Sequence, residues 1–168
     1  LEGTYPLPEA QIDRFMLKVV VDYPSREEEP MIVERMVGTT SVPTARAVTT
    51  PEAVLSARAL LDEVYVDPKL LGYVVDLVFA TRDPAAAGLD ALKPLLLYGA
   101  SPRAAIARGR AARARAFMEG RGYVTPHDVK AVGMEVLRHR VITTYAAEAE
   151  GVTSEDIVRE VFDNVRVP

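Results

Sequence analysis

Apart from one segment, the apolar positions of this chain follow a helical period, and side chains that can cap helices stand where the periodic stretches begin. Four starts place Ser, Thr or Asp before a proline, which is tolerated at the first helical position because its missing N–H would have no partner there. Two more starts have the spacing of a capping box, a hydroxyl followed three residues later by an acid. The starts are Ser25, Thr50, Asp67, Ser101, Thr125 and Thr153, and they predict helices over residues 25–36, 51–64, 68–82, 101–119, 125–137 and 153–164.

The segment from Phe15 to Val21 breaks this period. It is nearly continuously apolar, rich in β-branched residues, and ends at Asp22-Tyr23-Pro24. Such a run is typical of a strand covered on both faces in a parallel sheet. No second run of similar character is visible, and a single strand cannot satisfy its own backbone hydrogen bonds. We therefore expect a strand here whose partner strands belong to a part of the protein outside this chain.

Two stretches rich in turn-forming residues separate the predicted helices. Residues 38–50 predict a linker or a short extended crossing. Residues 83–94, which contain Asp83-Pro84, Gly88 and Lys93-Pro94, predict a loop. The remainder of the chain is predicted to be mostly α-helical.

The composition is that of a globular protein, with 168 residues, 49% apolar and 26% charged. The absence of cysteine excludes disulfides, thiolate metal sites and a cysteine nucleophile. The two histidines, His127 and His139, are too few and too far apart for a histidine metal site. No apolar run approaches the roughly 18 residues of a membrane span, and no leader begins the chain, so we expect a cytoplasmic protein without a membrane span. The opening at Leu1 suggests a fragment.

Charge and motifs exclude several further functions. The net charge of −4 argues against bulk electrostatic binding of nucleic acid. No G-x-x-x-x-G-K-[ST] or G-x-G-x-x-G is present, and no apolar strand ends in paired acids for magnesium, so residues 1–168 cannot build the usual ATP site alone. No serine stands in G-x-S-x-G, which leaves acyl transfer without a visible nucleophile.

Two arginines stand in positions that favour anion binding. Arg14 directly precedes the predicted strand, and Arg103 is at the second helical position after the Ser101 cap. The helix dipole opposes a cation in the first turn, and this mismatch makes sense if an anion binds between the free N–H groups and the guanidinium. The alternative is a surface arginine on an arginine-rich helix, and the residues alone favour this alternative.

Other charged residues have simpler explanations. Arg108, Arg110, Arg113, Arg115 and Arg121 continue the basic character of the helix and fit a solvated face, a subunit interface or a surface for an acidic partner. The acidic residues of 148–163 and Glu27–Glu29 fit solvation and the helix dipole. His139, between two arginines, is predicted to pack or cap rather than to catalyse, with its protonation disfavoured.

Several ordered blocks of the chain resemble the MoxR family of AAA+ ATPases. The first runs from Glu2 to Phe15 (EGTYPLPEAQIDRF) and continues with residues 22–29 (DYPSREEE). Residues 99–104 (GASPRA), 122–129 (GYVTPHDV) and 136–140 (VLRHR) are similar to the lid of the same family. The resemblance spans nearly the whole chain in order. It implies that the Walker A, Walker B and sensor 1 residues lie before Leu1.

The resemblance also implies roles for individual residues. By position, Arg14 matches the arginine finger that reaches a neighbouring subunit's nucleotide. Arg103 matches the sensor 2 arginine of the lid, which contacts the γ-phosphate, and with Ser101 it is expected to bind the cofactor. The implied cofactors are ATP and Mg²⁺, whose metal ligands lie outside this chain. A guanidinium suits both roles because it offers forked donors and fixed charge where negative charge accumulates in phosphoryl transfer.

The resulting fold expectation is mainly α: a helical-bundle AAA+ lid preceded by a remnant of the α/β AAA+ core. Its expected parts are the end of the core over residues 1–36, a linker over 37–50 and the lid over 51–168.

The implied function is a chaperone-like ATPase that remodels or matures partner complexes, some with metal-dependent adhesion-type domains. Hydrolysis would need a homo-oligomeric ring, expected to be a hexamer, and residues 1–168 alone are predicted to be inactive. One alternative is a stand-alone helical interaction module without nucleotide chemistry. A weaker alternative is the lid of a nucleic-acid remodeller.

Overall fold

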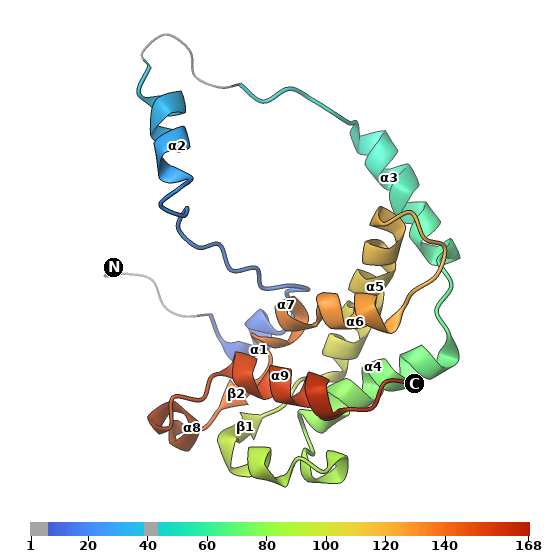
Figure 1. Ribbon diagram of the computed structural model, residues 1–168. Helices are drawn as coiled ribbons and strands as arrows, with labels where there is room; N and C mark the ends of the chain where they lie inside the picture. Colours follow the sequence, from blue (N-terminus) through green and yellow to red (C-terminus); the bar gives the residue numbers. More distant parts are fainter. Residues whose placement is uncertain (1–6, 39–43) are drawn as a thin grey trace. The chain divides into compact units, whose positions relative to one another are not determined.

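A computed structural model describes residues 7–38 and 44–168 of the chain (Figure 1). The described residues form two compact units. The larger unit joins the segment that ends at Lys18 to Leu60–Pro168, and the smaller unit comprises Val19–Ala59. The start of the motif at Glu2 and part of the linker expected over 38–50 lie outside the described residues; residues 44–50 form neither helix nor strand.

The larger unit is built around α5 (Pro102–Met118), which packs against α4 (Pro68–Ala80), α6 (Pro126–Ala131) and α7 (Gly133–Leu137). The helix α9 (Ser154–Asn164) contacts α4 and α7. Short elements complete the unit: α1 (Glu9–Ile12), α8 (Tyr145–Ala149), and the 3-10 turns η1 (Leu61–Glu63), η2 (Ala85–Ala87) and η3 (Asp90–Leu95). Two short strands, β1 (Leu96–Tyr98) and β2 (Ile142–Thr143), pair antiparallel, with Leu96 opposite Thr143.

Four helices of the larger unit, α4, α5, α6 and α9, begin at the capping residues that the sequence indicates. Asp67 accepts from the amide of Lys69, and Ser101 accepts from the amide of Arg103. Thr125 and Thr153 each form a complete capping box. These side chains satisfy amides that would otherwise lack partners in the first turn.

The core of the larger unit lies where α4, α5, α7 and α9 meet. Its fully buried side chains include Leu77 of α4, Val136 and Leu137 of α7, and Ile157 and Val161 of α9. The side of α5 that faces this core is lined by alanines (Ala104, Ala107, Ala111, Ala112 and Ala116). Small side chains let neighbouring helices approach closely. The predicted mainly helical fold is confirmed.

The smaller unit contains α2 (Glu29–Met36) and most of α3 (Pro51–Leu60), neither of which has a buried residue. Ser25 and Glu28 exchange the two hydrogen bonds of a capping box, at 3.3 and 2.8 Å, in the turn before α2. The helix itself begins at Glu29, later than predicted.

The strand expected from Phe15 to Val21, whose partner strands are expected outside residues 1–168, stays a prediction. The segment has no strand pairing, and Val19 and Val21 are 66% and 87% exposed. Its carbonyls find other partners instead: the carbonyl of Phe15 lies 3.1 Å from Nε2 of His139 and accepts from the Arg140 guanidinium. Side chains therefore satisfy the carbonyls of Phe15 and Met16 at the start of the segment.

Two further local predictions differ from the structure, and four short elements had no prediction. The helix expected over 125–137 is divided at Val132, whose φ of −95° and ψ of 0° interrupt the α conformation between α6 and α7. The loop expected over 83–94 contains the two turns η2 and η3, and Gly88 takes a left-handed conformation with φ +74° that suits glycine. The elements α1, α8, β1 and β2 were not predicted, because each is too short to show a period.

Candidate functional site

A cavity of about 190 Å³ lies at the N-terminal half of α5 in the larger unit. Two of its walls come from distant segments: Arg14 and Met16 follow α1, and Arg140 follows α7. The complete lining is Asp13, Arg14, Met16, Arg103, Ile106, Ala107, Arg110 and Arg140. The structure thus brings together the two arginines that the sequence singles out.

The first turn of α5 positions Arg103. The hydroxyl of Ser101 accepts from the Arg103 amide at 3.2 Å, which fixes the start of the helix. The same hydroxyl donates to the carboxylate of Asp13, at 2.9 Å to one oxygen. Ser101 therefore acts here as a cap and as a link to Asp13, and its role as a cofactor ligand stays a prediction.

Asp13 connects three parts of the site. Besides the Ser101 hydroxyl, its carboxylate lies 3.1 Å from Nε of Arg140 and 3.9 Å from Nη1 of Arg103. Burial lowers the pKa of Arg140, while the hydrogen bond and charge of Asp13 act in the opposite direction. One carboxylate thus holds the segment before Arg14 against the start of α5.

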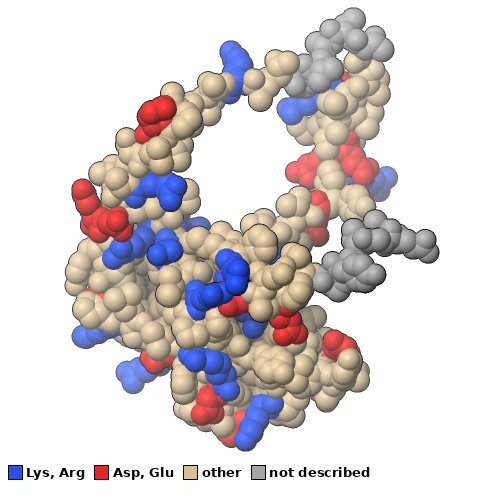
Figure 2. All heavy atoms as spheres, turned by 180° about the vertical axis from the view of Figure 1, so that it is seen from behind, with Lys and Arg blue, Asp and Glu red and all other residues tan. Residues whose placement is uncertain are grey.

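The cavity has an excess of positive charge. Four arginines line it, and Asp13 is the single acidic residue in its lining. The side chain of Arg103 is 56% exposed and Arg14 is also exposed, so both guanidinium groups are accessible to a solute. The forked donors of these two accessible guanidinium groups suit a phosphate or another polyanion. Figure 2 shows Lys and Arg side chains gathered in several places on one face, although the net charge of the chain is −4.

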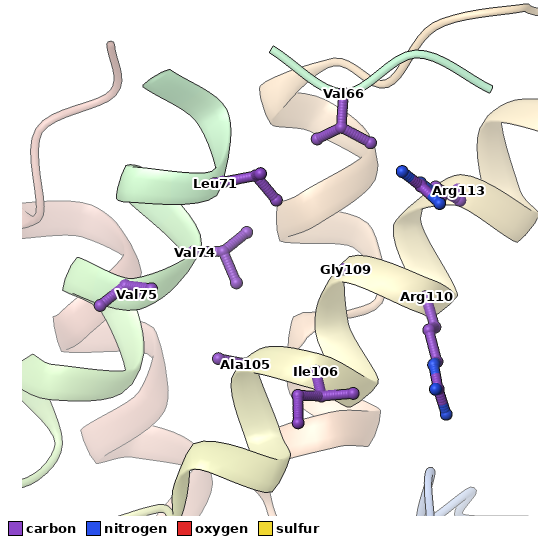
Figure 3. A pocket seen from close by; sticks show the side chains of 9 residues that line it. All are labelled: Val66, Leu71, Val74, Val75, Ala105, Ile106, Gly109, Arg110 and Arg113. Carbon is purple, nitrogen blue, oxygen red and sulfur yellow. The ribbon is translucent and has the colours of Figure 1, made fainter. Parts of the chain in front are cut away.

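A second cavity, of about 300 Å³, lies beside the first between α4 and α5 (Figure 3). Its wall is mostly apolar, with Leu71, Val74 and Val75 from α4 facing Ile106 of α5. Arg110 lines both cavities. The first cavity can therefore bind an anion, whereas the second offers mainly apolar contacts to a ligand.

Arg108 lies in the core, whereas the sequence predicted a solvated face, a subunit interface or a surface for an acidic partner. This side chain is fully buried, its guanidinium lies 4.4 Å from the centre of the Phe162 ring, and its Nε donates to the carbonyl of Val129 at 3.2 Å. Within the described residues, neither terminal nitrogen has a hydrogen-bond partner. Burial lowers the pKa of Arg108 to about 10. In the sequence it is one arginine among several, and no local signal distinguishes it.

The two histidines differ in exposure. His139 is buried, and its pKa is lowered by burial and by the nearby charges of Arg140 and Lys18, against the hydrogen bond to the carbonyl of Phe15. The predicted packing role and the disfavoured protonation are consistent with this. His127 is exposed. Among residues 7–38 and 44–168, no cluster of three or more His, Asp or Glu could hold a metal ion.

Comparison with known proteins identifies the larger unit. Residues 91–161 match the model of the AAA lid domain. This segment includes Arg103, Arg110 and Arg140. The class of protein defined by the fold and the match is therefore an AAA+ protein, represented here by its lid.

The relatives place the chain in a particular family. It is 43% identical to the chaperone MoxR1 of Mycobacterium tuberculosis over 99% of this chain and 44% of that protein. It is 36% identical to the protein MoxR of Paracoccus denitrificans over 88% of this chain and 46% of the relative. A crystal structure from Cytophaga hutchinsonii, of a protein proposed to be an ATPase, superimposes with a TM-score of 0.94 at 41% identity, over 99% of this chain and 51% of that one.

The chain belongs to the MoxR family of AAA+ ATPases, of which it forms the C-terminal, lid-containing portion. It spans about half the length of the relatives that it matches. In the part of the chain that the structure describes, no helix is long and apolar enough to cross a membrane.

Proposed function

We propose that this chain supplies two phosphate-contacting arginines, Arg14 and Arg103, to a MoxR-type ATPase that couples ATP hydrolysis to chaperone-like remodelling of partner proteins. The observation that carries the proposal is the cavity that both arginines line together with Arg110 and Arg140. Arg14 corresponds to the arginine finger and Arg103 to the sensor 2 arginine.

The chemistry follows from where charge accumulates. In phosphoryl transfer, negative charge spreads over the transferred group, and catalysis consists mainly of positioning and electrostatic stabilisation. Arg103 is held by the Ser101 cap at the start of α5, and Arg14 follows Asp13, which is itself fixed by Arg140. Bound Mg²⁺ would neutralise phosphate charge through ligands from the remainder of the protein.

The ring and the clients complete the proposal. An active site shared between subunits requires a homo-oligomer, and we propose a hexamer in the cytoplasm. The clients are proposed to be protein complexes, including ones with metal-dependent adhesion-type domains. Residues 1–168 alone are expected to hydrolyse no ATP, because the sequence contains no G-x-x-x-x-G-K-[ST] loop. The proposed domain boundaries stay at residues 1–36, 37–50 and 51–168.

The test is ATP hydrolysis by the full-length protein, with Arg14→Ala and Arg103→Ala compared with the wild type. Each variant is expected to lose about 10³-fold in kcat, the scale for arginines that stabilise phosphoryl transfer. Arg159→Ala is the matched control, because Arg159 is exposed on α9 and pairs with Asp156 and Glu155 of the same helix. Unchanged hydrolysis in all three variants would favour the alternative, an interaction module without nucleotide chemistry.

A further inference from the structure

Arg140 has an unusual set of partners for a buried arginine. A guanidinium has five N–H donors, and all five are used here. Nε donates to the Asp13 carboxylate at 3.1 Å, and Nη2 donates to the carbonyls of Asp13 and Phe15 at 3.0 and 2.5 Å. Nη1 donates to the carbonyls of Met16, at 3.3 Å, and Val136. The side chain is 2% exposed.

These partners lie on both sides of Arg14. The Asp13 carbonyl immediately precedes Arg14, and the Phe15 and Met16 carbonyls follow it. The backbone around Arg14 is therefore fixed at three carbonyls, one before it and two after it, by one side chain. Val136 belongs to α7, so the same guanidinium also holds this segment to the lid.

Neighbouring contacts hold the same segment. Nε2 of His139 lies 3.1 Å from the carbonyl of Phe15, and the amide of Lys18 donates to the carbonyl of Glu135 at 2.8 Å. Asp13 also accepts from Ser101, which begins the helix that carries Arg103. The backbone of Arg14 and the N-terminus of α5 therefore share one hydrogen-bonded network, with Arg140 at its centre.

We propose that Arg140 is a positioning residue, which holds Arg14 in the geometry where it and Arg103 act on the same phosphate group. The inference rests on the proposed function, since it assumes that Arg14 contributes to hydrolysis. Arg140 itself is buried and has all its donors occupied by protein, so it acts through Arg14 and not on the nucleotide. This role requires the branched guanidinium group. The single ammonium group of a lysine could retain the attraction to Asp13, but it could not bind the Asp13 carboxylate and the three backbone carbonyls around Arg14 at once.

The test is a double-mutant cycle on ATP hydrolysis by the full-length protein. Arg140→Gln is expected to lower kcat about 10-fold to 100-fold, the scale of a catalytic group displaced by about 1 Å. The KM for ATP is expected to change little, because an arginine that meets charge developing in the transition state affects kcat. In the Arg14→Ala background, Arg140→Gln is expected to cause no further loss, because its effect passes through Arg14.

Two further variants keep the test decisive. Arg140→Lys preserves the buried charge and is expected to fold and still to lose kcat, which covers the case in which Arg140→Gln unfolds. Arg138→Gln is the matched control: Arg138 is two residues away, 12% exposed, and pairs with Glu135 and Glu155. Arg138→Gln is expected to lower the Tm without lowering kcat. If Arg140→Gln acted only by a general loss of stability, the two variants would lower kcat alike.

The outcomes separate the inference from the proposed function. If Arg14→Ala hydrolyses ATP normally, the proposed function fails and the inference fails with it. If Arg14→Ala loses activity while Arg140→Lys does not, only the inference is overturned. An equal, additive loss from Arg140→Gln in the wild-type and Arg14→Ala backgrounds also overturns it, because Arg140 would then act independently of Arg14.

Discussion

The buried carboxylate of Asp128 accepts hydrogen bonds from both terminal nitrogens of Arg121, at 2.7 and 2.6 Å. It also accepts from the amide and hydroxyl of Thr125, both at 2.8 Å, which completes the capping box of α6. This arrangement links the end of α5 to the start of α6 through the GYVTPHDV block. That block, by which the sequence resembles its family, therefore has a structural role.

We expect Asp128→Asn to lower the free energy of unfolding by about 3 kcal/mol, because it leaves Arg121 without its buried counter-charge. Urea unfolding checks this. Asp156→Asn is the matched control, since Asp156 has the same capping-box position on α9 but is exposed. Its loss is expected to be clearly smaller, because water screens an exposed ion pair. Equal losses in the two variants would contradict the importance of the buried pair.

Acid unfolding gives a second prediction for Asp128. Burial acts to raise its pKa, but the bonds from Arg121 and Thr125 outweigh burial and lower the pKa to about 2, from an ordinary value of 3.8. Because the folded pKa is depressed, the stabilisation is present above pH 3.8 and is lost as the pH falls towards 2. In Asp128→Asn this part of the pH dependence of unfolding is expected to disappear. A variant with the wild-type acid profile would contradict the assignment.

Replacing Arg108 by methionine is expected to stabilise the protein. The desolvation of a buried cation costs several kcal/mol, and its contact with the Phe162 ring returns about 2 kcal/mol. We expect Arg108→Met to raise the free energy of unfolding by about 1 kcal/mol or more, as found when buried charges are replaced by apolar residues of similar volume. Arg108→Ala leaves a cavity beside Phe162 and is expected to be less stable than Arg108→Met, as measured by urea unfolding. A methionine variant no more stable than wild type would show that the contacts of the Arg108 guanidinium offset the cost of its desolvation.

Gly99, which lies shortly before α5, is close to the backbone of Thr81 at the end of α4. A Cβ at this position would lie 2.1 Å from the carbonyl oxygen of Thr81, whose hydroxyl accepts from the amide of Ala100 at 2.9 Å. Gly99→Ala is therefore expected to cost about 1–3 kcal/mol by overpacking. Gly72→Ala, in α4, is the control: nothing lies within 4 Å of its Cβ, and alanine there is expected to gain about 0.5–1 kcal/mol. Similar Tm shifts of the same sign would refute the close approach.

Much of the fold could be predicted because its signals are local. A cap such as Thr153 acts on an amide three residues away, so the start of α9 can be read from four successive residues. The same holds for the starts of α4, α5 and α6. The strand expected from Phe15 to Val21 cannot be read in the same local way. Strand formation depends on a partner, and in this chain the carbonyls of the segment instead meet Arg140 and His139.

The site was predictable in part. Arg14 and Arg103 were identified by their positions relative to a motif and a helix cap. Their common cavity was not predicted, and neither were the roles of Asp13, Arg140 and the buried Arg108. An arginine's surroundings depend on which distant helix covers it, and Phe162 and Val129, which cover Arg108, lie on α9 and α6.

The sequence by itself determined the starts of α4, α5, α6 and α9, the mainly helical class and the family, because caps, periods and motifs are properties of neighbouring residues. The tertiary structure alone decided which charges meet. Asp13 contacts Ser101 across 88 residues and Arg140 across 127. Such contacts form only when packing of the apolar core brings the segments together, since the chain between them specifies neither the distance nor the direction of approach.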